Sequence, residues 1–473
     1  MTTTPFSSAC AIAAQIREKE ISPVEVAHLH LERIERLNPK LNAFVDWKPE
    51  LVLAQARAAE QAVQRGENVG PLHGVPLSIK SSIDVAGHHC EAGTRLRAGY
   101  VAKEDAPLVA RLRAAGAVIL GVTNTPELLM AWETDNLIYG RTNNPWDLTR
   151  TPGGSSGGEA AAIAAGLSAG GVGSDGGGSI REPAHFCGIC GLKPTPGRIP
   201  STGHFPESGG PFALLGVVGP MARTVGDVRV LFEAMAGWDD GDPSSAPVPI
   251  REIPERELKA VGIGFFEEDG RTPVTAETRR AVRQSASLLE CAGYRVESFR
   301  PDGLEGVRAL WWKFFGTAGG MILGPMLRGH ESELSPILRE FYSWTAAEPV
   351  HSGQSLLATW LGRDEVREKI LVQMRKYPVL ICPTAAIPAF RHGEREWQVE
   401  GKTVKYLDAW SYCEWFNLLG LPAAVVPMGF SEDGLPIGVQ IVGRPWEEEL
   451  VLAIAGALEE ARGPWPNPPA DVT

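Results

Sequence analysis

Short apolar runs that alternate with helical segments limit most strongly which fold this chain can adopt. Residues 74–80 (GVPLSIK) and 117–122 (AVILGV) are bounded by glycine, and the helical pattern of residues 106–116 separates them. The same kind of run recurs at residues 260–266 (AVGIGFF) and 377–382 (YPVLIC). Apolar runs of this length are typical of strands buried in a sheet that helices cover on both faces. We therefore predict an α/β fold.

A hairpin pattern near the end of the chain makes the predicted sheet mixed. Residues 423–430 (AAVVPMGF) and 435–443 (LPIGVQIVG) flank the turn SEDG, as two antiparallel strands would. The 473 residues exceed the usual size of one domain, but no low-complexity linker marks a boundary. We expect one large domain over residues 1–473. Within it, residues 303–415 form a mostly helical segment rich in bulky aromatics, which either fill the core or line a hydrophobic substrate funnel.

Charge and cysteine content limit the partners and the compartment. The formal net charge of -12 argues against nonspecific binding to nucleic acid and favours a neutral or hydrophobic small molecule. The seven cysteines are odd in number and scattered, as in a reduced cytoplasmic protein. The first twenty residues lack the pattern of a secretory signal. The Ala/Gly-rich run after Glu159 is too short for a membrane span and predicts a buried helix that leads into a strand.

Two glycine-rich clusters, residues 153–158 (GGSSGG) and 174–181 (SDGGGSIR), imitate known motifs. Residues 171–176 (GVGSDG) match a dinucleotide-binding fingerprint, but a helical run precedes them where that motif needs a strand. Residues 153–157 match the G-x-S-x-G nucleophile elbow, but two prolines and no apolar run precede them. His185 and His204 are then ordinary hydrogen-bonded histidines rather than triad partners. No cofactor is expected.

Two further candidate sites depend on spacing and burial. Cys187 and Cys190 have the spacing of half a zinc site, but no second Cys or His pair completes it, so no metal is expected. Lys80 ends a predicted buried strand, where desolvation would lower its pKa and let it act as a base towards a serine. The alternative is that its side chain reaches water, as lysines at strand ends usually do.

Several distinctive segments are spread along the sequence. They are GPLHGVPLSIK, GVTNTPEL, GRTNNPWD, TPGGSSGGEAAAIAAG, VGSDGGGSIREPAHFCGICGLKPTPGRIP and GPMARTVGDV. Over about residues 70–228 these segments resemble the amidase signature family of serine hydrolases, and the hairpin of residues 423–443 resembles the C-terminal hairpin of that family.

The resemblance implies a Ser-Ser-Lys triad in which each residue has its own role. Ser179 is the nucleophile, Ser155 is the bridging serine, and Lys80 is the base. In the family the bridging serine follows a cis peptide bond, which here lies between Gly154 and Ser155.

The triple glycine of the second cluster is then expected to form the oxyanion hole. Backbone N–H groups of Gly176, Gly177 and Gly178 can converge on one oxygen because no side chains obstruct the turn. Asp175 and Arg181 flank the nucleophile and are expected to pair and support this loop. Many relatives carry Thr or Ile at the position of Gly176, a departure that we expect to affect the stiffness of the loop more than its chemistry.

The resemblance also places the acyl side of the substrate pocket on residues 128–132, with Leu129, Met130 and Ala131 as its substrate-binding residues. Glutamine amidotransferases of the family usually carry an acidic residue where residues 212–215 of this chain are apolar. This departure favours a stand-alone hydrolase.

The predicted function is an amidase for linear hydrophobic or aryl amides, with activity on esters and carbamates left open, as in aryl acylamidases, urethanases and esterases. Two alternatives stay open: the glutamine-hydrolysing A subunit of a tRNA-dependent amidotransferase, and a catalytically silent scaffold of the same fold. The predicted partner is a small-molecule amide, with no nucleic acid or membrane, and the predicted state is a monomer or a homodimer.

Overall fold

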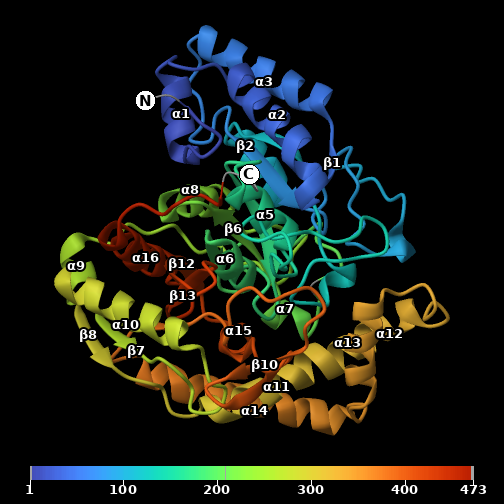
Figure 1. The fold of residues 1–473 in the computed structure, drawn as a ribbon, viewed down its shortest axis with the longest axis vertical. Coiled ribbons are helices and arrows are strands. Elements are labelled where there is room, and N and C mark those ends of the chain that lie inside the picture. The colour runs from blue at the N-terminus through green and yellow to red at the C-terminus, as the bar shows by residue number, and fades with distance from the viewer. Residues whose placement is uncertain (1–2, 208, 470–473) are drawn as a thin grey trace.

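A computed structural model describes residues 3–207 and 209–469. Eleven strands form one mixed sheet in the order β1-β3-β2-β4-β6-β5-β12-β13-β9-β7-β8, and β10 and β11 pair separately (Figure 1). The strands are β1 (Phe44–Trp47), β2 (Pro76–Lys80), β3 (Val118–Thr123), β4 (Gly170–Asp175), β5 (Cys190–Lys193), β6 (Val217–Ala222), β7 (Gly262–Phe265), β8 (Arg295–Ser298), β9 (Val379–Pro383), β10 (Glu396–Val399), β11 (Lys402–Lys405), β12 (Ala423–Phe430) and β13 (Pro436–Val442).

Helices flank this sheet on both faces, which confirms the predicted α/β fold. They are α1 (Ala9–Arg17), α2 (Pro23–Leu41), α3 (Pro49–Gln64), α4 (Pro107–Ala114), α5 (Gly157–Ala164), α6 (Arg181–Cys187), α7 (Phe212–Leu215), α8 (Val225–Met235), α9 (Glu255–Ala260), α10 (Ala276–Cys291), α11 (Val307–Trp312), α12 (Gly319–Leu327), α13 (Pro336–Ala346), α14 (Gly353–Gln373), α15 (Ser411–Leu418) and α16 (Glu448–Arg462). Among the described residues, none of these helices is both long and apolar enough to cross a membrane. Cytoplasmic location stays a prediction.

Alternate residues of the central strands bury two different faces. Ala424 and Val426 of β12 pack in the cluster that contains α8, α10 and α16, whereas Val425 packs in the cluster of α5 and α6. This is the two-residue period of a strand that is covered on both sides. The hairpin predicted for residues 423–443 is confirmed, because β12 and β13 pair antiparallel.

The parallel pairing of β2 with β4 brings the functional segments together. Leu77 pairs with Gly170 and Ile79 with Val172, so both strands end at the same edge of the sheet. Lys80 is the last residue of β2, and the triple glycine follows β4 directly. The predicted helix before β4 is α5, all eight residues of which are buried. A Cβ on Gly158 would lie 2.5 Å from the backbone of Asn124, so only glycine permits this packing.

The aromatic-rich segment is mostly helical, as expected, and runs through α11 to α15 with a π-helical turn at Lys313–Ala318. It also contains the small hairpin of β10 and β11, which the sequence did not reveal. Most of its aromatic side chains fill one cluster, where Trp410 is fully buried. A few of them line cavities, as described below.

Candidate active site

Lys80 lies at the centre of a group of serines. Its side chain is fully buried, and Nζ lies 2.7 Å from Ser155 Oγ, 3.0 Å from Ser156 Oγ and 3.0 Å from Ser174 Oγ. Within the described residues no carboxylate forms an ion pair with Lys80. The amine therefore does not reach water, which rejects the alternative of a solvent-exposed lysine.

Burial holds the pKa of Lys80 well below its ordinary value of 10.5. The charges of Asp175 and Glu159 oppose this shift but do not overcome it. Burial also raises the pKa of Glu159 to about 8, which reduces the negative charge that this carboxyl places near Lys80 at neutral pH. A neutral amine beside a hydroxyl oxygen is the arrangement that a lysine base requires.

A cis peptide bond joins Gly154 to Ser155, as the resemblance implies. The neighbouring backbone is held on both sides, since Thr125 Oγ1 donates to the Ser155 carbonyl (2.7 Å) and Gly154 N–H donates to Glu182 Oε2 (2.9 Å). Ser156 N–H donates to the Ser179 carbonyl at 3.1 Å. This last bond ties the first glycine cluster to the second.

The side chains of Ser155 and Ser179 line one cavity of about 520 Å³, a volume that includes its open mouth. Ser179 is 9% exposed and Ser155 is 1% exposed, so a molecule in the cavity meets Ser179 more readily. Leu129 and Met130, which are expected to bind the substrate, line this cavity. Ala131 is not among the described residues that line the cavity. Its carbonyl oxygen packs against Gly154 instead, and a Cβ added to Gly154 would lie 2.7 Å from that oxygen.

The loop after β4 is organised by the carboxylate of Asp175. That carboxylate accepts hydrogen bonds from the N–H groups of Gly178 (2.7 Å) and Ile180 (3.1 Å). The Gly178 N–H was expected to face the oxyanion, but it already has this internal acceptor. The sequence could not reveal this, because a run of glycines does not indicate which N–H groups turn inwards.

Asp175 and Arg181 form a fully buried ion pair, with Arg181 Nε 3.0 Å from Asp175 Oδ2. Burial alone would raise the pKa of the Asp175 carboxyl, but the Arg181 guanidinium holds it below its usual range. Arg181 also donates to Gln440 Oε1 (3.0 Å) and Asn417 Oδ1 (2.5 Å), and Asn417 donates in turn to the Asp175 carbonyl. Neither amide was identified from the sequence. Gln440 carried a usable signal as a polar residue within an apolar strand, whereas Asn417 carried none.

Replacing Arg181 by Met is expected to destabilise the fold by about 3–5 kcal/mol, because it leaves the Asp175 carboxylate buried without its partner. Urea unfolding of the purified variant measures this loss. The matched control is Arg229→Met, which removes an exposed i,i+4 pair with Glu233 and should change stability by less than about 1 kcal/mol. Equal losses in the two variants would contradict the supporting role of the buried pair.

The rejected motifs have ordinary structural explanations. His204 lines the cavity, but burial lowers its pKa to about 4 and its Nδ1 lies 2.9 Å from the Pro206 carbonyl. His185 is fully buried between two backbone carbonyls. Cys187 and Cys190 are buried free thiols, and no group of three potential metal ligands occurs in the described part of the chain.

The fold and this site define a class of protein: an α/β enzyme in which a buried lysine contacts one of two serines that line the same cavity. The model of the Amidase family matches residues 25–452, and the chain belongs to this family, the amidase signature enzymes. It is a serine-type hydrolase of amide C–N bonds.

Several named proteins are similar to this chain over most of its length. It is 35% identical to the A subunit of glutamyl-tRNA(Gln) amidotransferase from Synechococcus sp. (strain JA-2-3B'a(2-13)), covering 95% of this chain and 91% of the relative. It is also 35% identical to an indoleacetamide hydrolase of Bradyrhizobium diazoefficiens, over 96% and 86% of the two chains. The structure of a bacterial aryl acylamidase of the amidase signature family superposes with a TM-score of 0.85 at 29% identity, over 97% of each chain.

Proposed function

We propose that this protein hydrolyses linear amides with a hydrophobic acyl group, with Lys80, Ser155 and Ser179 as its catalytic residues. One observation carries the proposal: a buried amine lies 2.7 Å from Ser155 Oγ, and Ser155 lines the same cavity as Ser179. A neutral lysine in this position can accept a proton through Ser155.

In the proposed mechanism Ser179 Oγ attacks the carbonyl carbon while its proton passes to Ser155 and the proton of Ser155 passes to Lys80. The negative oxygen of the tetrahedral intermediate is stabilised by N–H groups of the glycine loop. Because Gly178 N–H donates to Asp175, we assign this role to Gly176, Gly177 and Ser179. When the C–N bond breaks, Ser155 returns a proton to the leaving nitrogen, and water then hydrolyses the acyl-enzyme by the same relay.

The walls of the cavity support a hydrophobic acyl group. Apolar side chains from four separate parts of the chain line it: Leu129, Met130, Phe212, Val217 and Phe315. An apolar lining with a few polar groups at the reacting centre is typical of sites for small organic molecules. Esters and carbamates belong to the same proposal, because both pass through a similar tetrahedral oxyanion.

The relatives named as parts of amidotransferases favour one second candidate, glutamine hydrolysis in a complex with other proteins. Glutamine would have to place a charged ammonium and a carboxylate near the wall that includes Phe212 of α7. Glu207, at the exposed rim, is the residue that could pair with the ammonium. The apolar wall makes this the weaker candidate.

Assay of the isolated protein distinguishes the candidates. We expect turnover of acyl anilides or hydrophobic primary amides without a partner, with kcat/KM at least about 100-fold above that for glutamine. The panel includes the matched esters and carbamates of the same acyl group. Glutamine hydrolysis that needs added partner proteins would establish the second candidate, and no turnover of any member would establish a silent scaffold.

A further inference from the structure

Two tryptophan indoles hold the glycine loop. Trp132 Nε1–H donates to the carbonyl of Gly177 at 3.0 Å, and Trp311 Nε1–H donates to the carbonyl of Gly176 at 2.9 Å. Both side chains are buried, and they reach the loop from distant parts of the sequence. Successive peptide groups of the loop thus each have their own indole donor.

Fixing a carbonyl also fixes the N–H on the other side of the same peptide plane. The cis bonds of the described residues are Gly154–Ser155 and Phe205–Pro206, so the peptides of the glycine loop are trans, and their C=O and N–H point in opposite directions. Trp132 therefore turns the Gly178 N–H away from itself, towards its acceptor Asp175. Trp311 likewise turns the Gly177 N–H away from α11.

Aromatic rings limit the space for a side chain at two of the three glycines. A Cβ on Gly177 would lie 2.5 Å from Trp311 Cζ2, and a Cβ on Gly176 would lie 3.1 Å from Phe315 Cε2. Trp311 and Phe315 are stacked, with ring centroids 4.6 Å apart and planes at 14°. A loop of three glycines has great conformational freedom, so its geometry depends on such external restraints.

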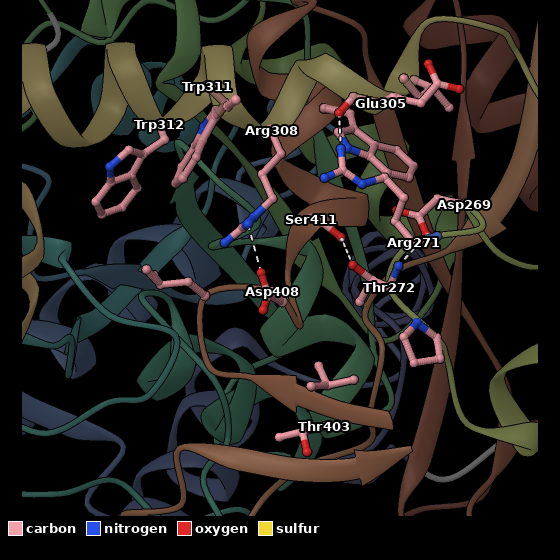
Figure 2. A pocket seen from close by; sticks show the side chains of 16 residues that line it. Asp269, Arg271, Thr272, Glu305, Arg308, Trp311, Trp312, Thr403, Asp408 and Ser411 are labelled. Carbon is pink, nitrogen blue, oxygen red and sulfur yellow. Dashed lines mark hydrogen bonds and ion pairs between the residues drawn. The ribbon is translucent and has the colours of Figure 1, made fainter. Parts of the chain in front are cut away.

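Trp311 is itself fixed by the way α11 is anchored. Figure 2 shows Trp311 and Trp312 projecting from α11 beside a second cavity, with Arg308 directed at Asp408. Arg308 Nη1 lies 2.8 Å from Asp408 Oδ1, and Arg308 Nε lies 3.4 Å from the buried Glu414 carboxylate. These ion pairs tie α11 to α15 and to the turn before it. The indole of Trp311 thus forms a wall between this cavity and the glycine loop.

We propose that Trp311 and Trp132 are positioning residues for the oxyanion-binding loop. Trp311 sets the direction of the Gly177 N–H, which is assigned to the oxyanion, and Trp132 holds the adjoining peptide, whose N–H belongs to Gly178 and donates to Asp175. The inference rests on the proposed function. Neither indole is assigned a contact with the substrate, and both act through the carbonyls of Gly176 and Gly177. Pre-oriented donors stabilise the transition state more than the bound substrate, so loss of an indole N–H should affect kcat rather than KM.

The test replaces each indole by phenylalanine, which keeps an aromatic ring but removes the N–H. Trp311→Phe is expected to lower kcat about tenfold, as for loss of one hydrogen bond, with KM within about threefold of wild type. Trp132→Phe, which frees the adjoining peptide, should also lower kcat rather than raise KM. Affinity for a trifluoromethyl ketone that carries the acyl group of the best substrate should fall by the same factor as kcat/KM. The matched control is Trp410→Phe, because the indole N–H of Trp410 is buried without a hydrogen-bond partner among the described residues and its ring stacks on Trp132.

The control separates packing from hydrogen bonding. If Trp410→Phe lowers kcat as much as the other two variants, or if the ketone affinity of those two is unchanged, the positioning role is wrong. Rates of Ser179 labelling by a fluorophosphonate add a readout that needs no amide substrate, and Trp132→Phe and Trp311→Phe should slow it. If the wild-type protein hydrolyses no amide, the proposed function is wrong. The labelling rates of the variants still test the role of the indoles in that case.

Discussion

Replacing Ser179 by Ala is expected to lower kcat by about 10⁵-fold or more, because it removes the atom that attacks the carbonyl carbon. A fluorophosphonate should label the wild-type protein at Ser179 and should not label the variant. Steady-state kinetics on the best amide of the panel and mass spectrometry of the labelled peptide measure the two effects. Ser179 lies in a loop and is 9% exposed, so removal of its hydroxyl group should leave the fold intact.

Ser156→Ala is the matched control for this prediction. Ser156 is a neighbouring buried serine that also contacts Lys80, with Oγ 3.0 Å from Nζ. It does not line the cavity as Ser155 and Ser179 do, within the part of the chain described. Its removal should therefore keep fluorophosphonate labelling at Ser179 and retain measurable turnover. Labelling of any other serine in the wild-type protein would contradict the assignment of the nucleophile.

Local sequence patterns predicted several strands of the sheet. They also singled out Lys80 and the two glycine-rich clusters of the site. The hairpin of residues 423–443 could be predicted because apolar runs flank a turn, and Lys80 stood out because it ends a buried strand. Contacts between residues that are far apart in the sequence could not be predicted from local patterns. Asn417 and Trp311 reach the glycine loop from more than a hundred residues away, and only the folded chain places them there.

The glycine loop shows where local reasoning fails. Three successive glycines indicated a turn with converging N–H groups, and the loop does lie at the edge of the cavity through Gly176. Which N–H groups face the substrate depends on acceptors and donors outside the loop. The Asp175 carboxylate accepts a hydrogen bond from the Gly178 N–H, and the indoles of Trp132 and Trp311 donate to the carbonyls of Gly177 and Gly176. The departure at Gly176 also has a physical reason, because a Cβ there would lie 3.1 Å from Phe315 Cε2, a tight contact.

Replacing Lys80 by Ala is expected to lower kcat by about 10²–10⁴-fold, because it removes the base that draws the proton from Ser155. Lys80→Met distinguishes the loss of the amine from the loss of packing, since methionine fills most of the same buried space without a basic nitrogen. Both variants should lose activity to the same extent. A Lys80→Met variant with near wild-type kcat would contradict the role of Lys80 as the base.

The pH dependence of the wild-type protein gives an independent test. Lys80 must be neutral to accept a proton, so kcat/KM should rise about tenfold per pH unit below its pKa in the free enzyme and level off above it. Burial lowers that pKa well below 10.5, so the activity should level off well below pH 10. An activity that rises steadily to pH 10 would mean that the lysine titrates as an exposed amine.

The same pKa shift predicts how stability changes with pH. Because the pKa of Lys80 is lower in the folded than in the unfolded protein, the unfolded chain binds more protons in the window between the two values. Stability must therefore rise with pH in that window, by at most about 1.4 kcal/mol per unit from this group. Lys80→Met lacks the group, so the wild type should gain stability relative to this variant as the pH rises towards the ordinary lysine value of 10.5, as measured by urea unfolding at each pH. A difference that is independent of pH would show that Lys80 has the same protonation in both states, and the relay through Ser155 would then have no base.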